Sequence, residues 1–155
     1  MGEEMYQKLK QFYADNGIIV REIHHAFGAT AEDYHNAVGC LYEQQAKCLL
    51  IKVYAESEYF VMFTIPAQKR ADLETVKQIF NARKVRMATR DELKRITGCD
   101  FGEVPPSGKL FGIKLLMDKD FLNEREVFLN AGRVDVSFVV NPHDIQRVED
   151  PIMVR

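Results

Sequence analysis

Residues 98–108 read Gly-Cys-Asp-Phe-Gly-Glu-Val-Pro-Pro-Ser-Gly and lie between a well-marked helix and an apolar, strand-like run. Glycine allows backbone angles that other residues reach only with strain, and each proline fixes its own φ angle. Pro106 also holds Pro105 in an extended conformation. The sequence therefore predicts a loop of fixed shape, which is most useful where a ligand must contact backbone atoms. A rigid connector that binds no ligand is the alternative.

This loop does not have the spacing of a phosphate-binding loop. A P-loop has four residues between its glycines, followed by Lys and then by Ser or Thr. Here five residues separate Gly102 from Gly108, and Leu110 follows Lys109. The two prolines also remove two backbone N–H donors of the kind that hold a phosphate. A phosphate cradle is therefore the wrong interpretation of this stretch.

Local signals on both sides of the loop predict a mixed α/β fold. Thr89 and Glu92 form a capping box for a helix that Gly98 ends, and Asn141 and Pro142 can begin a last helix. Further helices are expected at 3–16, at 30–38 with Thr30 as its cap, and at 73–81 with Asp72 as its cap. Strands are expected at 18–23, 44–54, 59–65, 84–88, 113–117, 126–129 and 136–140. Since no linker or repeat is visible, we expect one domain over residues 1–155, an α+β fold with a mixed sheet flanked by helices.

A lysine opens the apolar strand expected at residues 44–54. Alternation places Lys47 on the same face as Leu49, Ile51 and Val53. A lysine at a strand end commonly extends into water, which is the simpler interpretation. The alternative is that Lys47 enters a cleft and holds a polar ligand group there. On that alternative we expect the cleft to be shared with the loop at 102–108.

Composition narrows the class of protein. The chain has 155 residues, 46% of them hydrophobic, and a net charge of −2, which is typical of a globular protein without a broad basic surface. It has no apolar run long enough to span a membrane, and its first residues lack the pattern of a secretion signal. Three cysteines without CxxC spacing and scattered histidines argue against disulfides and a metal site. We therefore expect a cytoplasmic protein that uses no metal or cofactor and binds neither a membrane nor DNA.

A series of short motifs runs from about residue 30 to residue 148. The most specific is Thr97-Gly98-x-x-x-Gly102-x-Val104-Pro105-Pro106-x-Gly108. The others are Thr30-x-Glu32, Gly39, Gln44-x-x-Lys47, Ile65-Pro66, Asp72-Leu73, Lys84-Val85-Arg86-Met87-Ala88-Thr89, Glu92-Leu93, Asn130-Ala131-Gly132-Arg133 and Asn141-Pro142-x-Asp144-Ile145. Each piece is weak alone, but in this order and spacing they resemble the YbaK-type aminoacyl-tRNA editing domain family, which is related to the editing insertion of prolyl-tRNA synthetase.

The resemblance implies a fold, a reaction and a set of site residues. Members of the family hydrolyse the ester bond of a mischarged aminoacyl-tRNA in trans and without a metal. Lys47 matches the characteristic site residue of the family, and the loop from Gly102 to Gly108 matches the loop that lines the same pocket. The residues then expected to contact the aminoacyl end are Gly102, Pro105, Pro106, Gly108, Asn130, Gly132, Asp135 and Cys48. The implied partner is the acceptor end of an aminoacyl-tRNA, with an aminoacyl-tRNA synthetase as a further candidate.

Two departures from the family pattern bear on the chemistry. The family often has Thr or Ser after the lysine and Phe before the last loop glycine, where this chain has Cys48 and Ser107. These differences leave the amino acid of the substrate open. Cys48 would need a partner that lowers its pKa to act as a nucleophile, and its strand position predicts a buried thiol instead. Lys47 is therefore expected to orient the ester and stabilise charge.

A non-catalytic module that binds an aminoacyl or nucleotide ligand is the competing interpretation. The chain is mildly acidic, whereas a protein that grips tRNA broadly should carry basic clusters. The local candidates are Lys8 and Lys10, Lys69 and Arg70, and Arg83, Lys84 and Arg86, and such groups are commonly solvated faces. Capture of the acceptor end alone does not require a broad basic surface. We therefore favour the enzyme over the binding module.

Overall fold

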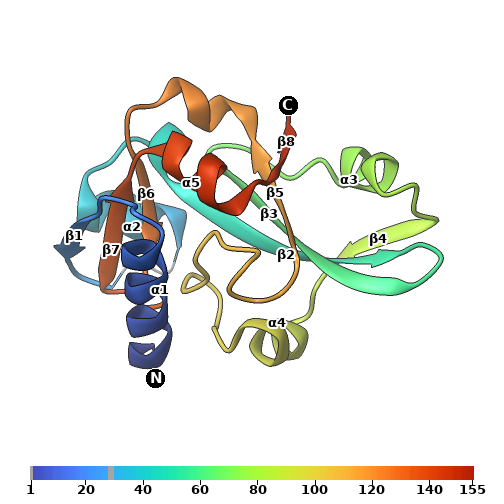
Figure 1. Ribbon diagram of the computed structural model, residues 1–155, viewed down its shortest axis with the longest axis horizontal. Helices are drawn as coiled ribbons and strands as arrows, with labels where there is room; N and C mark the ends of the chain where they lie inside the picture. The colour runs from blue at the N-terminus through green and yellow to red at the C-terminus, as the bar shows by residue number, and fades with distance from the viewer. Residues whose placement is uncertain (1, 28–29) are drawn as a thin grey trace.

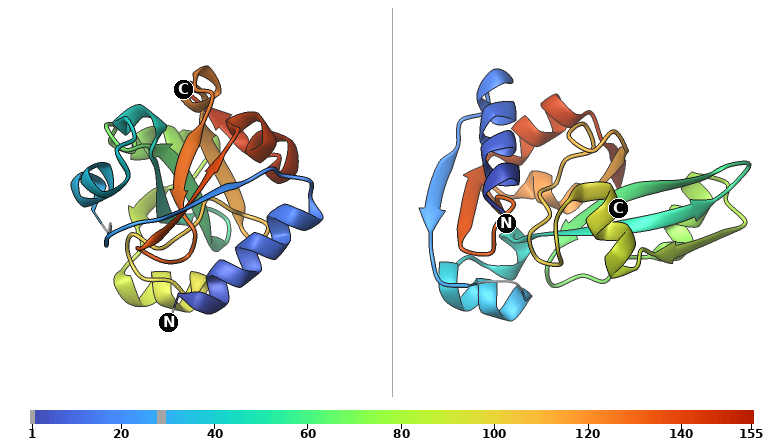
Figure 2. Two further views of the ribbon diagram at one scale, coloured as in Figure 1. Left: turned by 90° about the vertical axis from the view of Figure 1, so that its left-hand side faces the viewer. Right: turned by 90° about the horizontal axis from the view of Figure 1, so that it is seen from below.

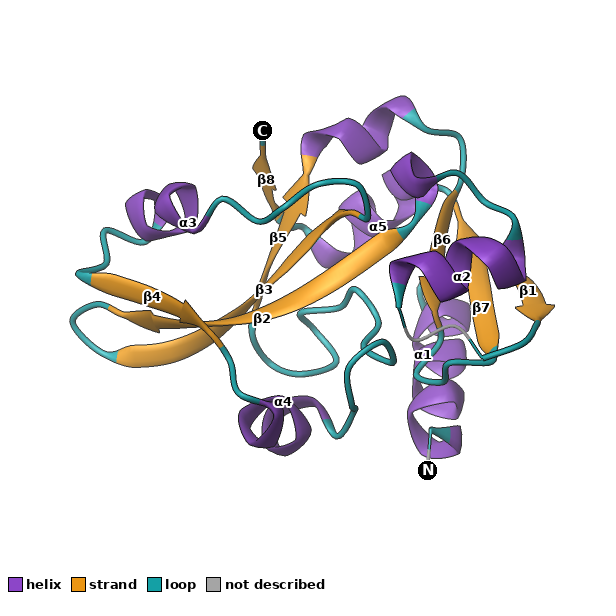
Figure 3. Cartoon of the chain, turned by 180° about the vertical axis from the view of Figure 1, so that it is seen from behind, coloured by secondary structure: helices purple, strands orange, loops and turns teal. Residues whose placement is uncertain are grey.

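The structure is a computed structural model that describes residues 2–27 and 30–155. Its mixed α/β class is as predicted, but its strands form two sheets (Figures 1 and 3). The smaller sheet is antiparallel and consists of β1 (Arg21–His24), β7 (Val136–Val140) and β6 (Val127–Asn130), in that order. The larger sheet consists of β4 (Lys84–Met87), β2 (Ala46–Tyr54), β3 (Glu58–Pro66), β5 (Lys114–Asp118) and β8 (Ile152–Val154), in that order.

The larger sheet is built on the long hairpin of β2 and β3. These strands are antiparallel, with Leu50 opposite Met62, and β4 continues the antiparallel pattern beside β2. On the other side, β5 runs parallel to β3, and β8 runs parallel to β5. The closed end of the hairpin projects from the rest of the molecule (Figure 2, right). Its open end meets the smaller sheet, where a single bridge pairs Gln45 with Phe128 of β6.

Within the described part of the chain, five α-helices form where the local signals predict them. They are α1 (Glu3–Asp15), α2 (Ala31–Val38), α3 (Leu73–Ile79), α4 (Arg90–Thr97) and α5 (Pro142–Glu149). The predicted caps are confirmed: the side chains of Thr30, Asp72, Thr89 and Asn141 all accept hydrogen bonds from backbone N–H groups of the first turn. Each cap satisfies a donor that the helix itself leaves unpaired. In the part of the chain that is described, no helix combines the length and the apolar character needed to cross a membrane.

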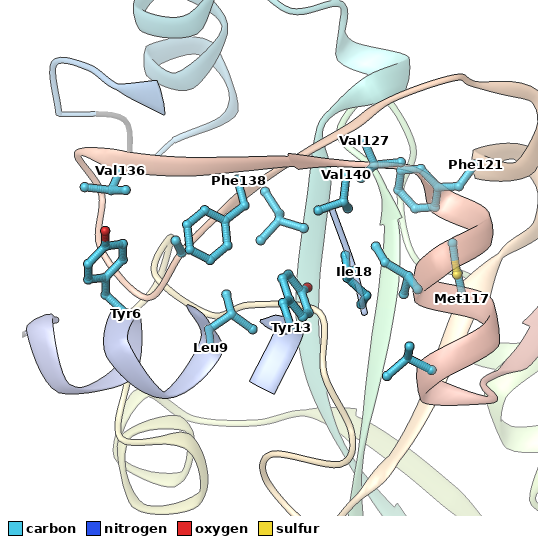
Figure 4. Close-up of a cluster of buried hydrophobic side chains, with 14 residues drawn as sticks. Tyr6, Leu9, Tyr13, Ile18, Met117, Phe121, Val127, Val136, Phe138 and Val140 are labelled. Atoms are coloured by element: carbon cyan, nitrogen blue, oxygen red, sulfur yellow. The ribbon is translucent and has the colours of Figure 1, made fainter. Parts of the chain in front are cut away.

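Apolar side chains gather on both faces of the larger sheet. On one face Ile51, Val61 and Phe63 pack with Val76 of α3. On the opposite face Leu50, Met62 and Leu115 pack with Leu93 of α4 and Val104 of the loop. A further cluster joins α1 to the smaller sheet and to α5, with Leu9, Tyr13 and Phe138 fully enclosed (Figure 4). The candidate active site lies between these packed layers, so core packing fixes the position of its walls.

Some predicted boundaries were wrong. The first strand begins at Arg21 and not at Ile18, because its pairing with β7 covers only Arg21–His24. Helix α3 ends at Ile79, two residues before the predicted end, and its buried residue is Val76, whereas Ile79 is exposed. The sequence did not predict the short 3-10 helices at Tyr42–Gln44 and Lys119–Asn123, or strand β8.

Candidate active site

A cleft of about 260 Å³ opens where the two sheets meet. Its walls come from the start of α2, the start of β2, the end of β6 and the first half of the 98–108 loop. Figure 3 shows α2 beside the beginning of β2. Four of the residues expected from the sequence line it together, namely Lys47, Cys48, Gly102 and Asn130. Segments far apart in the chain therefore bring a cation, a thiol, an amide and a glycine backbone to one cavity.

Lys47 is a cation without a carboxylate partner among the described residues. Its Nζ donates a hydrogen bond to the carbonyl oxygen of Lys69 at 3.0 Å. Burial lowers the pKa of Lys47 from its ordinary value, and the positive charge of Arg70 lowers it further. Lys69 differs, because its ammonium pairs with Asp118 at 3.0 Å and with Asp120. The charge of Lys47 is thus left uncompensated at the cleft wall, and its ammonium has two further N–H donors.

Cys48 is a half-buried residue that follows Lys47 on β2. Its Sγ lies 3.5 Å from Oγ1 of Thr64 on the neighbouring strand. Burial raises the pKa of the Cys48 thiol to about 12. A thiol that remains protonated at neutral pH is a poor nucleophile. The environment of Cys48 therefore favours a packing role over covalent catalysis.

The loop at 98–108 divides into two halves with different surroundings. In its first half, Phe101, Gly102 and Val104 line the cleft, and the Gly102 carbonyl accepts a hydrogen bond from Nδ2 of Asn130. A positive φ of 82° at Gly102 is a conformation that favours glycine. In its second half, the residues from Pro105 onward are buried and take no part in the cleft wall. The expectation that the whole loop lines the pocket is thus met only by its first half.

Glu149, at the end of α5, holds the second half of the loop. Its carboxylate accepts hydrogen bonds from Ser107 Oγ at 2.6 Å, from Gly108 N at 3.0 Å and from Lys109 N at 3.1 Å. A Cβ atom added at Gly108 would lie 2.4 Å from the carbonyl oxygen of Ile113. At Gly108 the close contact that requires glycine is thus with the protein's own backbone.

Five predicted contact residues lie outside the cleft wall. Pro105, Pro106 and Gly108 are buried in the second half of the loop. Gly132 has a φ of 81° and packs beneath α1, where a Cβ atom would lie 2.6 Å from Met5. Asp135 pairs with Arg133 through two contacts of 2.8 Å. In this structure the five residues thus take part in loop packing, a close backbone contact or an ion pair outside the cleft wall.

Several lining residues were missed by reasoning from the sequence. They include Thr30, Ala31, Tyr34, Gln45 and Phe101. Thr30 and Val104 stand in the motifs quoted above, but the sequence does not say which motif residues face a cavity. Gln45 donates through Nε2 to the Ala31 carbonyl at 3.2 Å, and its buried Oε1 has no partner among the residues described. The sequence did not indicate a role for Phe101, because the surroundings of an aromatic residue in a loop cannot be read from the sequence.

A chain of hydrogen bonds fixes Tyr34 in the cleft wall. The Tyr34 hydroxyl donates to Ser137 Oγ at 2.6 Å, and Ser137 Oγ lies 2.7 Å from His25 Nε2. His25 Nδ1 faces the Ala26 carbonyl at 2.7 Å, which can only accept, so Nε2 is free to accept the Ser137 proton. Ser137 is fully buried and the Asp135 carboxylate bonds elsewhere, so these residues do not form a catalytic triad.

Metal ligation has no support within residues 2–27 and 30–155, where no three His, Cys, Asp or Glu side chains are grouped to hold an ion. The cleft instead combines an uncompensated ammonium with amide and backbone groups on fixed elements. Such a site can orient an ester and stabilise the negative charge that develops on its carbonyl oxygen during hydrolysis. It lacks an activated side-chain nucleophile of the Ser–His or Cys–His type in the described wall.

Comparison with known proteins agrees with this chemistry. The family model for the aminoacyl-tRNA editing domain matches residues 25–148. The chain is 28% identical over 156 residues to the "Multifunctional Ser/Thr-tRNA deacylase ProXp-y" of Escherichia coli strain K12, covering 99% of this chain and 93% of that protein. It also resembles the crystal structure of a hypothetical protein, with a TM-score of 0.85, 20% identity, and coverage of 94% of this chain and 96% of the other.

A second solved structure, of a candidate trans-editing enzyme for prolyl tRNA synthetase, superimposes with a TM-score of 0.80 and 24% identity. The match covers 97% of this chain and 94% of the other. At these identities the solved structures establish the fold, while the family model covers most of the chain and establishes the family. The chain belongs to the aminoacyl-tRNA editing domain family.

Proposed function

We propose that this protein hydrolyses the ester bond of a mischarged aminoacyl-tRNA in trans and that Lys47 is its catalytic residue. Deacylation as the reaction follows from membership of the editing family. The observation that carries this role is that Lys47 lines the cleft and that, among the described residues, its ammonium has a single backbone carbonyl as its partner. Two remaining N–H donors can hold the ester carbonyl oxygen as it gains negative charge.

In this proposal the other cleft residues position the aminoacyl end. Asn130 holds the Gly102 carbonyl, so the glycine backbone presents a fixed surface to the substrate. Cys48 bounds the space for the amino-acid side chain and remains a thiol throughout. Ser107, the other departure from the family pattern, bonds to Glu149 outside the cleft and does not affect pocket size. The attacking group is thus water or a substrate hydroxyl.

Small hydroxylated amino acids are the first substrates to test. The named activity of the E. coli relative is on Ser- and Thr-tRNA. The Gln45 Oε1 atom, buried at the cleft wall without a described partner, is an acceptor that a substrate hydroxyl could satisfy. A buried acceptor left unpaired costs about 1–3 kcal/mol, so a ligand that pairs with it is favoured over an apolar one of equal size. We place this activity in the cytoplasm, with an aminoacyl-tRNA synthetase as a candidate partner.

Single-turnover deacylation of a panel of mischarged tRNAs tests the proposal. Lys47→Ala should lose about 10²–10³-fold in rate, the usual effect of removing one charge-stabilising donor. Lys47→Arg should also fail, because a planar guanidinium presents its donors differently. Lys52→Ala is the matched control, since Lys52 lies on the same strand, pairs with Glu58 and is absent from the cleft wall.

Two results would refute the assignment. An active Lys47→Ala protein would remove Lys47 from the chemistry. An unmutated protein that binds aminoacyl-tRNA analogues but deacylates no member of the panel would support the binding module in place of the enzyme.

A further inference from the structure

An aromatic ring stands exposed at the rim of the cleft. Phe101 is 57% exposed, although it belongs to a turn whose neighbours are well packed. It lines the main cleft and also a smaller adjoining chamber of about 40 Å³. That chamber is otherwise apolar, with Leu93 and Met87 in its wall. The ring therefore stands at the rim of both cavities, with much of its surface facing solvent.

The turn that carries Phe101 is held from both sides. Asp100 pairs with Arg90 through contacts of 3.0 and 2.6 Å, and the Asp100 N–H donates to Glu103 Oε1 at 2.7 Å. The Glu103 N–H returns to the Asp100 carbonyl at 3.1 Å, and Asn130 holds the carbonyl of the following residue, Gly102. A ring on a fixed turn loses little conformational freedom when a ligand stacks on it.

Positive charge lies close to this cleft. Arg70 is exposed and has no hydrogen bond or ion pair with any residue in the described ranges. It directly follows Lys69, whose carbonyl oxygen accepts a hydrogen bond from Lys47 Nζ at 3.0 Å, so the two cations lie close together, and the charge of Arg70 lowers the pKa of Lys47. The adjacent Lys69 is already neutralised by Asp118 and Asp120. An unpaired guanidinium next to the site is suited to an anionic group such as a phosphate.

We infer that Phe101 is a stacking platform for the terminal nucleobase of the aminoacyl-tRNA and that Arg70 contacts a phosphate of its acceptor end. The inference rests on the proposed function, because the ester attaches the amino acid to the ribose of that terminal nucleotide. With the ester at Lys47, the base emerges at the rim. At the rim, the exposed ring of Phe101 does not contact the amino-acid side chain of the substrate, but its flat face can stack on a base. Stacking on aromatic rings is the sequence-tolerant contact expected at a single-stranded end.

Two serine esters provide the test, one attached to a nucleotide and one without any nucleotide. The first is a minihelix carrying serine at its 3′ end, and the second is serine methyl ester, which has no nucleotide. Phe101→Ala should raise KM for the minihelix about 10-fold or more, within the range for loss of one stacked base, and should leave kcat within about 3-fold. Hydrolysis of serine methyl ester should be unchanged.

Conservative and control variants separate stacking from simple packing. Phe101→Trp should keep the KM for the minihelix near that of the unmutated protein. Phe101→Leu, whose side chain is apolar but has no π face, should raise this KM as Phe101→Ala does. Arg70→Gln should raise KM for the minihelix alone. Ile19→Ala removes an exposed apolar side chain outside the cleft and should not change the hydrolysis of either substrate. Equal losses on both substrates for Phe101→Ala would overturn the inference, since the ring would then shape the aminoacyl pocket. No loss on either would overturn it too.

A binding measurement keeps the inference independent of turnover. Adenosine 5′-monophosphate should shift the NMR signals of the Phe101 ring in the unmutated protein, and Phe101→Ala should weaken its binding about 10-fold. If this binding is found but no ester is cleaved, the proposed function fails and the stacking site stands. If adenosine 5′-monophosphate binds equally well to Phe101→Ala, the stacking site is refuted even in an active enzyme.

Discussion

Replacing Glu149 with alanine should destabilise the fold far more than it impairs the site. The carboxylate of Glu149 is 7% exposed and accepts three hydrogen bonds, from Ser107 Oγ and from the N–H groups of Gly108 and Lys109. Alanine would remove the acceptor and leave the buried donors of Ser107 and Gly108 without partners. The second half of the loop would then lose its attachment to α5.

The size of the effect follows from these contacts. Each hydrogen bond to a charged acceptor contributes about 1.5–3 kcal/mol, but three bonds to one group are not additive. Leaving the buried donors of Ser107 and Gly108 unpaired costs about 1–3 kcal/mol each, or roughly 2–6 kcal/mol together. For a chain of this length each kcal/mol lowers Tm by roughly 2–4 °C, so Glu149→Ala should lower Tm by roughly 4–24 °C. Glu149→Gln keeps one carbonyl acceptor and should lose about half as much.

Thermal unfolding followed by circular dichroism measures this directly. Glu56→Ala, at an exposed position in the turn between β2 and β3, is the control for loss of a carboxylate. Deacylation measured well below both midpoints should remain within about 3-fold of normal, because Asn130 holds the cleft-lining half of the loop separately. A Tm for Glu149→Ala within about 2 °C of the Glu56→Ala control would refute the anchoring role, and a large loss of activity with normal Tm would give the residue a part in the site.

Three further results are expected. The pKa of Lys47 is lowered from its ordinary value of 10.5, so enzymatic deacylation, corrected for spontaneous hydrolysis, should decline as pH rises towards that value. Arg70→Gln removes a positive charge that lowers this pKa, so it should move the decline to higher pH. An unchanged pH profile for Arg70→Gln would contradict this coupling. Cys48→Ser should keep most of its activity in the same assay, and an inactive variant with a normal Tm would indicate an acyl-enzyme. Gly108→Val should lower Tm sharply because its side chain would collide with the Ile113 carbonyl, and an unchanged Tm with lost deacylation would return Gly108 to the ligand site.

The elements of this fold could be predicted where their signals are local. The side chain of Thr89 caps α4, with Glu92 three residues on, and Gly98 ends that helix with a φ of 73°. These interactions span one turn of chain and depend little on the rest of the molecule. Lys47 could be singled out for the same reason, because the two-residue period of a strand shows a charge at the end of an apolar face.

The site itself was only partly accessible from the sequence. The motifs place Lys47, Cys48, Gly102 and Asn130 in an editing domain, and the structure brings these four to one cleft. The same motifs did not indicate that Phe101 faces solvent at the rim. Motif residues that serve packing and those that face a cavity look alike in a sequence, because both restrict the residue type at their position.

Tertiary structure alone decided how the glycine–proline loop is used. Its composition determines a fixed backbone, since glycine and proline set the accessible φ angles locally. What that backbone contacts depends on Glu149, which lies 41 residues beyond Gly108 and reaches it through the packing of α5. The division of the strands into two sheets has the same origin. Whether β6 pairs with β7 and β2 with β3 depends on how well their side chains pack against those of neighbouring strands. Local angles are determined by each residue's own atoms, whereas contacts between distant segments are determined by the burial that the complete chain achieves.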